Sequence, residues 1–337
     1  MRIENDLTRM LNLRLPLGMA PMFLVSNEAM IREAIGAGIL GCFPSLNFRK
    51  EGELEGVLER LNQFLQTRQG QPGTYGVNLI VQRSNFLFER HLKVCVDRKV
   101  PVYITSLGNP TETIQAAHAY GAKVFCDVTN LTHAEKCARN GCDGFIAVGQ
   151  GAGGHAGPYP LSLLVRTLKS HFPDIPVLAA GGIADGSGIL SALASGASLA
   201  YCGTRFIATS EAPVGQPYKD AVIQSGMDQI VLTERISGTP CTVIRTPFVE
   251  KIGLKQNRFE RWLGKNPRTR KYFKMLVQKR GFNWLEEAVK PGNYNNLWCA
   301  GQSVELIHDI VPVRTIVDRY ESELNEAWQA LSATIRP

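Results

Sequence analysis

One histidine of this 337-residue chain lies in a glycine-rich stretch, GQGAGGHAG at 149–157. An imidazole titrates near neutrality, so His155 is a candidate general acid or base. The first six letters also match the GxGxxG fingerprint of dinucleotide-binding folds, in which a helix must open within the motif. Here Pro158 and Pro160 follow, and helical periodicity begins only near Leu161. We therefore predict a glycine loop that presents His155 to a site, the alternative being a loop histidine without a role.

Two further glycine-rich turns follow apolar, strand-like segments. They read AGGIADG at 180–186 and GTRF at 203–206. Glycines at strand ends let backbone N–H groups approach an anion closely. The loops after the last two strands of a parallel barrel commonly bind phosphate. The pair of turns predicts a phosphate site, whereas each turn alone could simply need glycine for its backbone conformation.

Two segments earlier in the chain could hold a flat ring. The sequence MAPM at 19–22 ends one strand-like segment, and Asn78 lies at the end of another. The Asn amide offers both a donor and an acceptor to the edge of a heteroaromatic ring. Together with the phosphate turns, these residues predict a pocket for a flat, phosphorylated cofactor.

The elements that must position these motifs alternate regularly along the chain. Short apolar segments with strand character occur at 17–23, 38–43, 75–81, 100–106, 122–128, 144–149, 175–181 and 197–203. Amphipathic segments fill the intervals at 26–36, 53–68, 84–98, 111–120, 131–140, 161–171, 186–195 and 215–226. Apolar strands that alternate with helices indicate a parallel sheet buried on both faces. Eight such units can close into a (β/α)8 TIM barrel, and the motifs at the strand ends favour this α/β fold over an open, doubly wound sheet.

The rhythm of strands and helices divides the chain into three predicted parts. Residues 1–227 are expected to form the barrel that carries the site. The alternation stops after this point, and residues 228–300 are predicted to be a smaller, mainly helical subdomain. Residues 301–337 are predicted to form a closing helix that packs back on the barrel, with an interruption near Pro312.

The net charge of +7 is unevenly distributed. Residues 251–280 contain eleven Lys or Arg and a single acid, Glu260. Such a basic block can attract an anionic partner, although a solvated helical face is the plainer interpretation. We expect a small-molecule substrate and no nucleic-acid or membrane partner, and the oligomeric state stays open.

Neither a membrane span nor a metal site is predicted. No apolar run reaches eighteen residues, and the N-terminus lacks the apolar core of a secretory signal. The eight cysteines include no CxxC pair, and His133, Cys137 and Cys142 lack a fourth zinc ligand. We expect buried thiols in a reducing compartment, and hence a cytoplasmic protein.

As a set, the motifs resemble those of the nitronate monooxygenase family, formerly called 2-nitropropane dioxygenases. That family shares its fold with flavin-dependent enoyl-acyl-carrier-protein reductases. The matching stretches are MAPM at 19–22, GVN ending at Asn78, AGGH ending at His155, AGGIADG at 180–186, GTRF at 203–206 and AGQSVELIHDI at 300–310. The resemblance covers nearly the whole chain.

The resemblance implies a flavin mononucleotide (FMN) at the mouth of the barrel and assigns residues to it. The phosphate would be bound by Gly181, Gly182, Gly203 and Thr204. The remaining cofactor-binding positions would be Ala20, Pro21, Met22, Asn78, Asp127, Gly153 and Cys202. His155 would be the catalytic base that removes the proton alpha to a nitro group.

Two positions depart from the pattern of the family. Members often carry Glu before the AGGH motif, where this chain has Gly151, and some place a Lys near the flavin where this chain has Asp127. An anion at position 127 would disfavour a reduced, anionic flavin. Both departures bear on the substrate rather than on FMN binding.

The leading hypothesis is oxidation of alkyl nitronates or nitroalkanes by FMN and dioxygen, with His155 as base. The main alternative is an enoyl-thioester reductase in which NAD(P)H reduces the flavin. Its acidic substrate, on an acyl carrier protein or coenzyme A, would suit the basic block at 251–280. A flavin-free barrel enzyme acting on a sugar phosphate and a non-catalytic flavin-binding protein are further alternatives. Yellow colour would separate the flavin hypotheses from the flavin-free one, and turnover would separate an enzyme from a scaffold.

Overall fold

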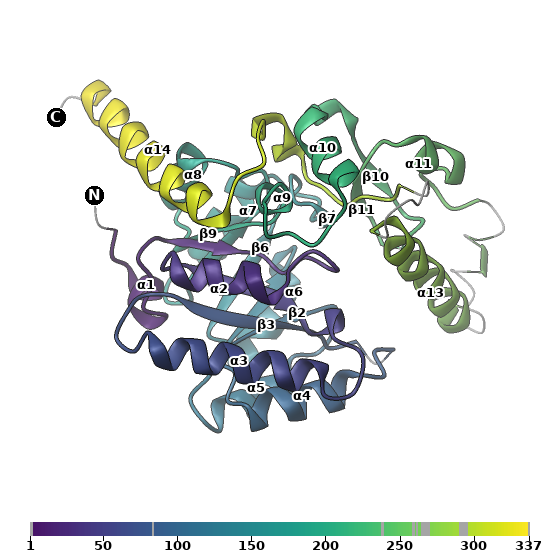
Figure 1. The fold of residues 1–337 in the computed structure, drawn as a ribbon, viewed down its shortest axis with the longest axis horizontal. Helices are drawn as coiled ribbons and strands as arrows, with labels where there is room; N and C mark the ends of the chain where they lie inside the picture. The colour runs from purple at the N-terminus through teal and green to yellow at the C-terminus, as the bar shows by residue number, and fades with distance from the viewer. Residues whose placement is uncertain are drawn as a thin grey trace.

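The computed structural model describes residues 3–82, 84–236, 239–257, 260, 262–263, 270–289 and 296–335. Its core is a closed barrel of eight strands in the order β1-β2-β3-β4-β5-β6-β8-β9 (Figure 1). β1 pairs in parallel with both β2 and β9. The predicted (β/α)8 barrel is therefore confirmed, and an open, doubly wound sheet is excluded.

Each predicted strand segment corresponds to one strand of the barrel. The strands are β1 Leu17–Met19, β2 Leu40–Pro44, β3 Thr74–Ile80, β4 Val102–Ser106, β5 Lys123–Val128, β6 Gly144–Val148, β8 Val177–Ala180 and β9 Leu199–Cys202. β1 is shorter than expected, so MAPM continues into the loop after it. Because the strands are parallel, their carboxyl ends all open at the same end of the barrel.

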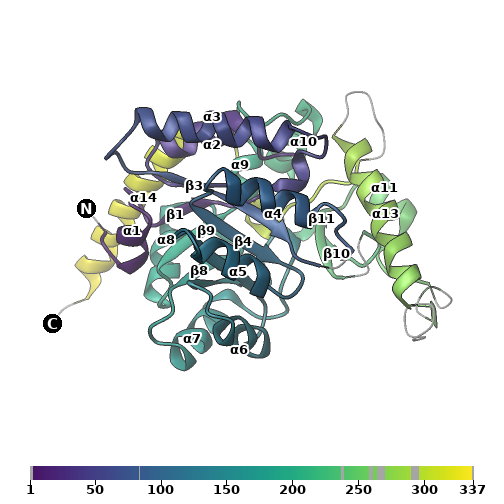
Figure 2. The same cartoon turned by 90° about the horizontal axis from the view of Figure 1, so that it is seen from below.

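Helices connect the strands and cover the outside of the barrel (Figures 1 and 2). They are α2 Glu28–Gly36, α3 Glu53–Thr67, α4 Phe88–Asp97, α5 Thr111–His118, α6 Leu131–Arg139, α7 Leu161–His171, α8 Gly186–Ala194 and α10 Gln216–Gln224. Two short pieces follow strands directly, η1 Ser45–Asn47 and α9 Thr204–Ile207. Since α7 begins only at Leu161, the GxGxxG match opens no helix, and the rejection of a dinucleotide fingerprint is confirmed.

The barrel interior is filled by side chains and closed at its amino end. Leu40, Ile104 and Tyr201 from the strands pack in one inner cluster with Leu7 of the short helix α1 (Asp6–Met10). Asn5 caps α1, and its side-chain amide donates to the Ser198 carbonyl, just before β9, at 2.7 Å. The amino end is thus plugged, and only the carboxyl end is left to hold a ligand.

The segment after α10 contains two strands that the sequence did not predict. After η2 (Met227–Gln229), β10 (Ile230–Thr233) and β11 (Cys241–Ile244) form an antiparallel pair. β11 also pairs with β7 (Gly154–His155), which gives a three-stranded sheet in the order β10-β11-β7. The expectation of a mainly helical subdomain therefore omitted the sheet that joins this segment to the histidine loop.

The described helices of this segment are α11 (Pro247–Ile252) and α13 (Arg270–Ala288). They contain part of the basic block. Positions 258, 261, 265 and 268 of that block lie outside the described residues. The prediction for the block as a whole consequently stays a prediction.

The chain returns to the barrel through η3 (Gln302–Leu306) and α14 (Val313–Thr334), which begins directly after Pro312. α14 packs on α8 and α2, whereas α13 lies at the opposite end of the molecule (Figures 1 and 2). Neither of these two helices, nor any other in the described part of the chain, has the length and apolarity to cross a membrane.

Arg205 of the GTRF motif anchors the returning segment. The buried guanidinium donates to Asp309 Oδ1 at 2.5 Å and to the Asp309 backbone carbonyl at 3.2 Å. Arg319 of α14 pairs with the same carboxylate. This part of the motif therefore holds the fold together rather than contacting a ligand.

The crossing of α8 and α14 gives a stability prediction. A Cβ at Gly186 would lie 2.1 Å from the Leu324 nitrogen and 2.5 Å from the Tyr320 carbonyl oxygen, so α14 must shift to admit Ala. Overpacking of this kind costs about 1–3 kcal/mol. We expect Gly186→Ala to lower the free energy of unfolding by about that amount in urea denaturation. The control is Gly36→Ala in α2, where a Cβ meets nothing within 4 Å. Equal stability of the two variants would contradict the close contact between α8 and α14 at Gly186.

Candidate functional site

The carboxyl ends of the barrel strands open into one large cavity of about 2330 Å³. Ligand pockets usually enclose about 300–1000 Å³, so this cavity has room for a cofactor and a substrate together. It is lined by all twelve residues named from the sequence: Ala20, Pro21, Met22, Asn78, Asp127, Gly153, His155, Gly181, Gly182, Cys202, Gly203 and Thr204. The structure brings the predicted site residues together, while the role of each stays a prediction.

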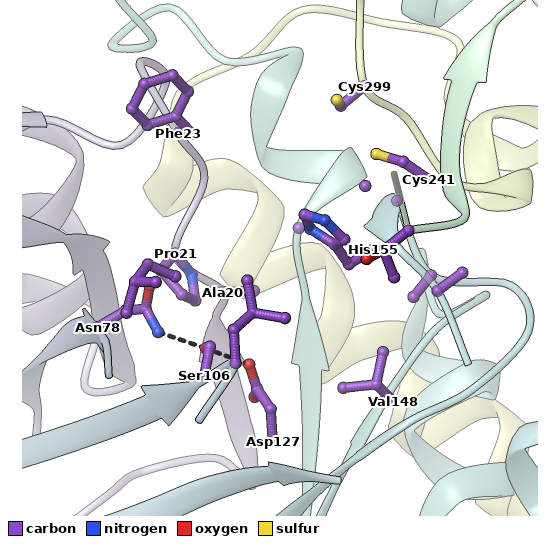
Figure 3. A pocket seen from close by; sticks show the side chains of 18 of the residues that line it. Ala20, Pro21, Phe23, Asn78, Ser106, Asp127, Val148, His155, Cys241 and Cys299 are labelled. Carbon is purple, nitrogen blue, oxygen red and sulfur yellow. Dashed lines mark hydrogen bonds between the residues drawn. The ribbon is translucent and has the colours of Figure 1, made fainter. Parts of the chain in front are cut away.

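A chain of polar side chains crosses one wall of the cavity, from β3 to β5 (Figure 3). Asn78 Nδ2 donates to Ser106 Oγ at 2.7 Å, and Ser106 Oγ in turn donates to Asp127 Oδ2. Asp127 is half-buried, and its removal from water raises the pKa of the carboxyl to about 6 against the opposing effect of the Ser106 hydrogen bond. This wall therefore carries a carboxyl group that changes its charge near neutral pH.

His155 lies across the cavity from this polar chain (Figure 3). In the β7–β11 pairing, His155 is opposite Cys241 and Gly154 is opposite Thr242. Thr242 Oγ1 lies 2.6 Å from the Ala152 carbonyl oxygen and 3.2 Å from that of Gly154. The glycine loop is thus held in place by β11 of the subdomain, and His155 is presented from a short strand rather than from an isolated loop.

Each of the two predicted phosphate turns has one glycine whose Cβ position is not crowded. A Cβ on Gly203 would come no closer than 3.7 Å to another atom, and one on Gly182 would meet nothing within 4 Å. Gly182 also has a φ of +72°, a conformation that other residues rarely adopt. Its N–H donates to the Gly151 carbonyl at 3.2 Å, which links this turn to the histidine loop. An anion held by backbone N–H groups requires open space of this kind.

Close backbone packing accounts for other glycines near the turns. A Cβ on Gly181 would lie 2.9 Å from the Ala152 nitrogen, and one on Gly153 would lie 2.8 Å from the Gly301 nitrogen. The Thr204 hydroxyl oxygen accepts a hydrogen bond from the Gly301 N–H at 2.9 Å. The hydroxyl hydrogen of Thr204 can still be donated to a ligand. Gly153 and Thr204 therefore also serve to join the histidine loop to the returning segment.

The outer rim of the cavity carries several exposed hydrophobic side chains among polar and charged ones. Its exposed large hydrophobic side chains are Phe86 and Leu107 from the loops after β3 and β4, Leu232 of β10, and Met275 and Leu276 of α13. A rim of this kind is typical of surfaces that receive an apolar ligand or partner.

An ion pair ties the rim of the barrel to the subdomain. Arg49, which follows η1 and lines the cavity, pairs with Glu286 of α13. The Arg49 guanidinium also lies 5.3 Å from the ring centroid of Phe23, in the loop after β1. This contact connects two barrel loops to the helix that carries part of the rim of the cavity.

Comparison with known proteins identifies the family. A sequence profile described as nitronate monooxygenase matches residues 49–321, well over half of the chain. The chain belongs to the nitronate monooxygenase family. The resemblance noted from its motifs is thereby confirmed, and the protein is a flavin-dependent oxidoreductase.

Curated relatives of this family member differ in the reactions that their names describe. The (3aS,4S,5R,7aS)-5-hydroxy-7a-methyl-1-oxo-octahydro-1H-indene-4-carboxyl-CoA dehydrogenase of Mycobacterium tuberculosis is 30% identical over 75% of this chain and 69% of its own length. A probable nitronate monooxygenase of Staphylococcus aureus is 24% identical over 97% of this chain and 99% of its own.

The solved structures that are similar to this chain also include enzymes with different names. FabK from Thermotoga maritima is similar with a TM-score of 0.83 and 30% identity, over 99% of this chain and 100% of its own. A nitroalkane oxidase from Streptomyces ansochromogenes has a TM-score of 0.74 and 25% identity, over 97% of this chain and 100% of its own. Family membership therefore establishes the class of enzyme and leaves the substrate to be argued from the site.

Two polar residues of the site were missed from the sequence. Ser106 ends β4, between the strand that carries Asn78 and the strand that carries Asp127, so polar strand ends on three consecutive strands were a usable signal. Thr242 had no such signal, because it reaches the histidine loop from 88 to 90 residues away.

Thr242 gives a prediction about positioning. Thr242→Val removes the hydroxyl that holds the Ala152 carbonyl, so His155 should lose its placement over the cavity while flavin content stays unchanged. Small misplacements of a reacting group can cost about 100-fold in rate, and we expect a loss of about 10–100-fold in kcat. Thr242→Ser should restore the rate. Thr233→Val on the neighbouring strand β10, where the hydroxyl bonds to Leu254 instead, is the control, and full activity of Thr242→Val would contradict the assignment.

Proposed function

We propose that this protein is an FMN-dependent oxidoreductase that oxidises an activated carbon acid, with alkyl nitronates and nitroalkanes as the first candidate substrates. The observation that supports this proposal is the arrangement of one cavity. His155 lies on one side, the Asn78 amide lies across from it, and the open turns at Gly182 and Gly203 line the same space (Figure 3).

The residues present are suited to FMN. The uncrowded Cβ positions at Gly182 and Gly203 would let a phosphate approach the backbone of both turns closely. Pro21 and Met22 offer an apolar surface, and Asn78 offers a polar edge, to a flat ring system. When bound, FMN supplies a two-electron acceptor that can pass electrons on to dioxygen.

His155 carries the proton chemistry of this proposal. A ring nitrogen of the imidazole removes the proton from the carbon next to the nitro group, and the electron pair stays on the substrate as the nitronate. A base with a pKa near the working pH is the most effective for such a step. Thr242 and β11 restrict the positions of the imidazole and so reduce the entropy lost on reaching the reactive arrangement.

The experiment is anaerobic mixing of the yellow holoenzyme with an alkyl nitronate, followed by admission of dioxygen. Loss of the visible flavin absorbance with the nitronate and its return with dioxygen would support the proposal. Purified protein without flavin, or flavin that no nitronate or nitroalkane reduces, would overturn it.

A second candidate, reduction of an enoyl thioester by NAD(P)H through FMN, is favoured by the size of the cavity and by the exposed hydrophobic side chains on its rim. A small nitroalkane beside FMN would leave much of the 2330 Å³ unfilled, whereas Phe86 and Leu276 could contact an acyl chain. Lys279 of the basic block also lines the cavity and suits the phosphates of coenzyme A or of an acyl carrier. Oxidation of NAD(P)H that depends on an enoyl thioester, without turnover of nitroalkanes, would select this candidate.

A further inference from the structure

The Asp127 carboxyl lies on the wall where the cofactor is proposed to bind, and no cation of the described residues pairs with it. It accepts the Ser106 hydroxyl, whose oxygen in turn accepts the Asn78 amide. From the described residues, only the loss of water and the Ser106 hydrogen bond shift its pKa, and no cation contributes. An ionised carboxyl in this position opposes any further negative charge that develops in the cavity.

The titratable neighbours of Asp127 do not gain or lose a proton near neutral pH. Burial raises the pKa of Cys42 in β2 to about 12 and raises that of Tyr201 in β9 as well. The pKa of Cys137 in α6 is raised by its hydrogen bond with Cys126 and by burial. All three groups therefore stay protonated across the range in which Asp127 titrates.

Apart from the Cys126 thiol on β5 itself, the charged side chains and histidines that line the described part of the cavity lie on different elements. His133, Lys136 and Arg139 line it from α6, Lys279 from α13, His155 from β7, and Arg49 from the loop after η1. None of them contributes to the shift at Asp127. β4 and β6, the strands on either side of β5, place the uncharged Ser106 and Ile146 beside Asp127.

We propose that Asp127 takes up a proton when the bound cofactor is reduced, so that the net charge of the pocket stays constant through the redox cycle. This inference rests on the proposed FMN binding and adds a redox-linked proton site to it. Asp127 is ionised while the cofactor is oxidised, and it becomes protonated when the cofactor gains negative charge, because like charges raise the pKa of a carboxyl.

The step balances in electrons and protons. Two electrons pass from the reductant, either the substrate or dithionite, to the cofactor. Two protons are drawn from solvent: one accompanies the electrons onto the cofactor, and the other goes to a carboxylate oxygen of Asp127. On reoxidation, dioxygen would accept the two electrons and become hydrogen peroxide, and the protons from the cofactor and from Asp127 would leave together, to the peroxide or to solvent.

The test is the pH dependence of the midpoint potential of the bound flavin, because its slope gives the number of protons taken up per two electrons. Between pH 7 and 8 we expect the wild-type holoenzyme to take up close to one proton more than Asp127→Asn, and this difference should shrink as the pH falls through 6. At pH 5 the two proteins should take up the same number, since Asp127 is then protonated in both redox states. The control is Asp174→Asn, an exposed carboxyl outside the cavity, which should behave as wild type.

A second variant and a second readout keep the inference separate from the proposed function. Ser106→Ala removes the hydrogen bond that favours the ionised carboxyl, so the pH at which the extra proton disappears should move upward. In the flavin-free protein, the infrared carbonyl band of a protonated carboxyl should titrate near pH 6 and be missing in Asp127→Asn. Protein without flavin would overturn the proposed function. If wild type and Asp127→Asn both bind and reduce flavin and take up equal numbers of protons, this inference alone would be overturned. If Asp127→Asn binds no flavin, Ser106→Ala decides instead: an unchanged pH dependence of its midpoint potential would overturn the inference.

Discussion

Replacement of His155 by Asn should lower kcat/KM for a neutral nitroalkane by about 10²–10⁴-fold, the usual cost of losing a general base. Asn keeps a hydrogen-bonding side chain of similar size but cannot accept the proton. The flavin content should stay near that of the wild type, because the proposed cofactor contacts at Gly182, Gly203 and Asn78 do not involve the His155 side chain. Steady-state rates and the flavin-to-protein absorbance ratio measure the two effects.

Comparing a nitroalkane with its preformed nitronate shows whether His155 acts as a base or only binds the substrate. A preformed nitronate has already lost the proton, so His155→Asn should impair its oxidation much less than that of the parent nitroalkane. His171→Asn, in an exposed histidine at the end of α7, is the matched control and should leave both rates unchanged. If His155→Asn and wild type oxidise the neutral nitroalkane equally well, His155 is not the base.

The barrel was predictable because its signal is local. The strands are short apolar segments buried on both faces, as in β2, where all five residues are buried. The end of β1 was misjudged because Ala20, Pro21, Met22 and Phe23 remain apolar after the strand stops at Met19. Those residues are apolar because they line the cavity, so composition alone could not separate strand from pocket wall.

The site was predictable at the strand ends and not where distant segments meet. Asn78, Asp127, Gly182 and Gly203 follow from the order of the strands, because parallel strands bring their carboxyl ends together. The β7–β11 pairing involves only two residues of the histidine loop, which is too short for any periodicity. The approach of Gly153 to Gly301 likewise appears only once the returning segment is in place, since nothing in either local sequence specifies the other.

Gly203→Asp should give a folded protein that has lost most of its FMN. The new Cβ has space, because its nearest neighbour would be Ala20 Cβ at 3.7 Å, and the φ of −109° is accessible to Asp. The carboxylate would then project toward the proposed phosphate. Two charges about 4 Å apart near a protein surface repel by about 4 kcal/mol, which corresponds to about a 1000-fold weaker Kd for FMN.

Isosteric substitution separates charge from bulk at this turn. Gly203→Asn adds nearly the same volume without charge, so FMN should bind to it more tightly than to Gly203→Asp, and Gly203→Ala should bind nearly as the wild type does. Gly182→Asp should also release FMN, but its φ of +72° strains any side chain, so Gly203 is the cleaner position. Fluorescence titration of the flavin-free variants with FMN gives the Kd values, and circular dichroism confirms that they are folded. Stoichiometric FMN in both Gly182→Asp and Gly203→Asp would place the phosphate elsewhere, because a dianion held by these two turns cannot tolerate a carboxylate in the space it fills.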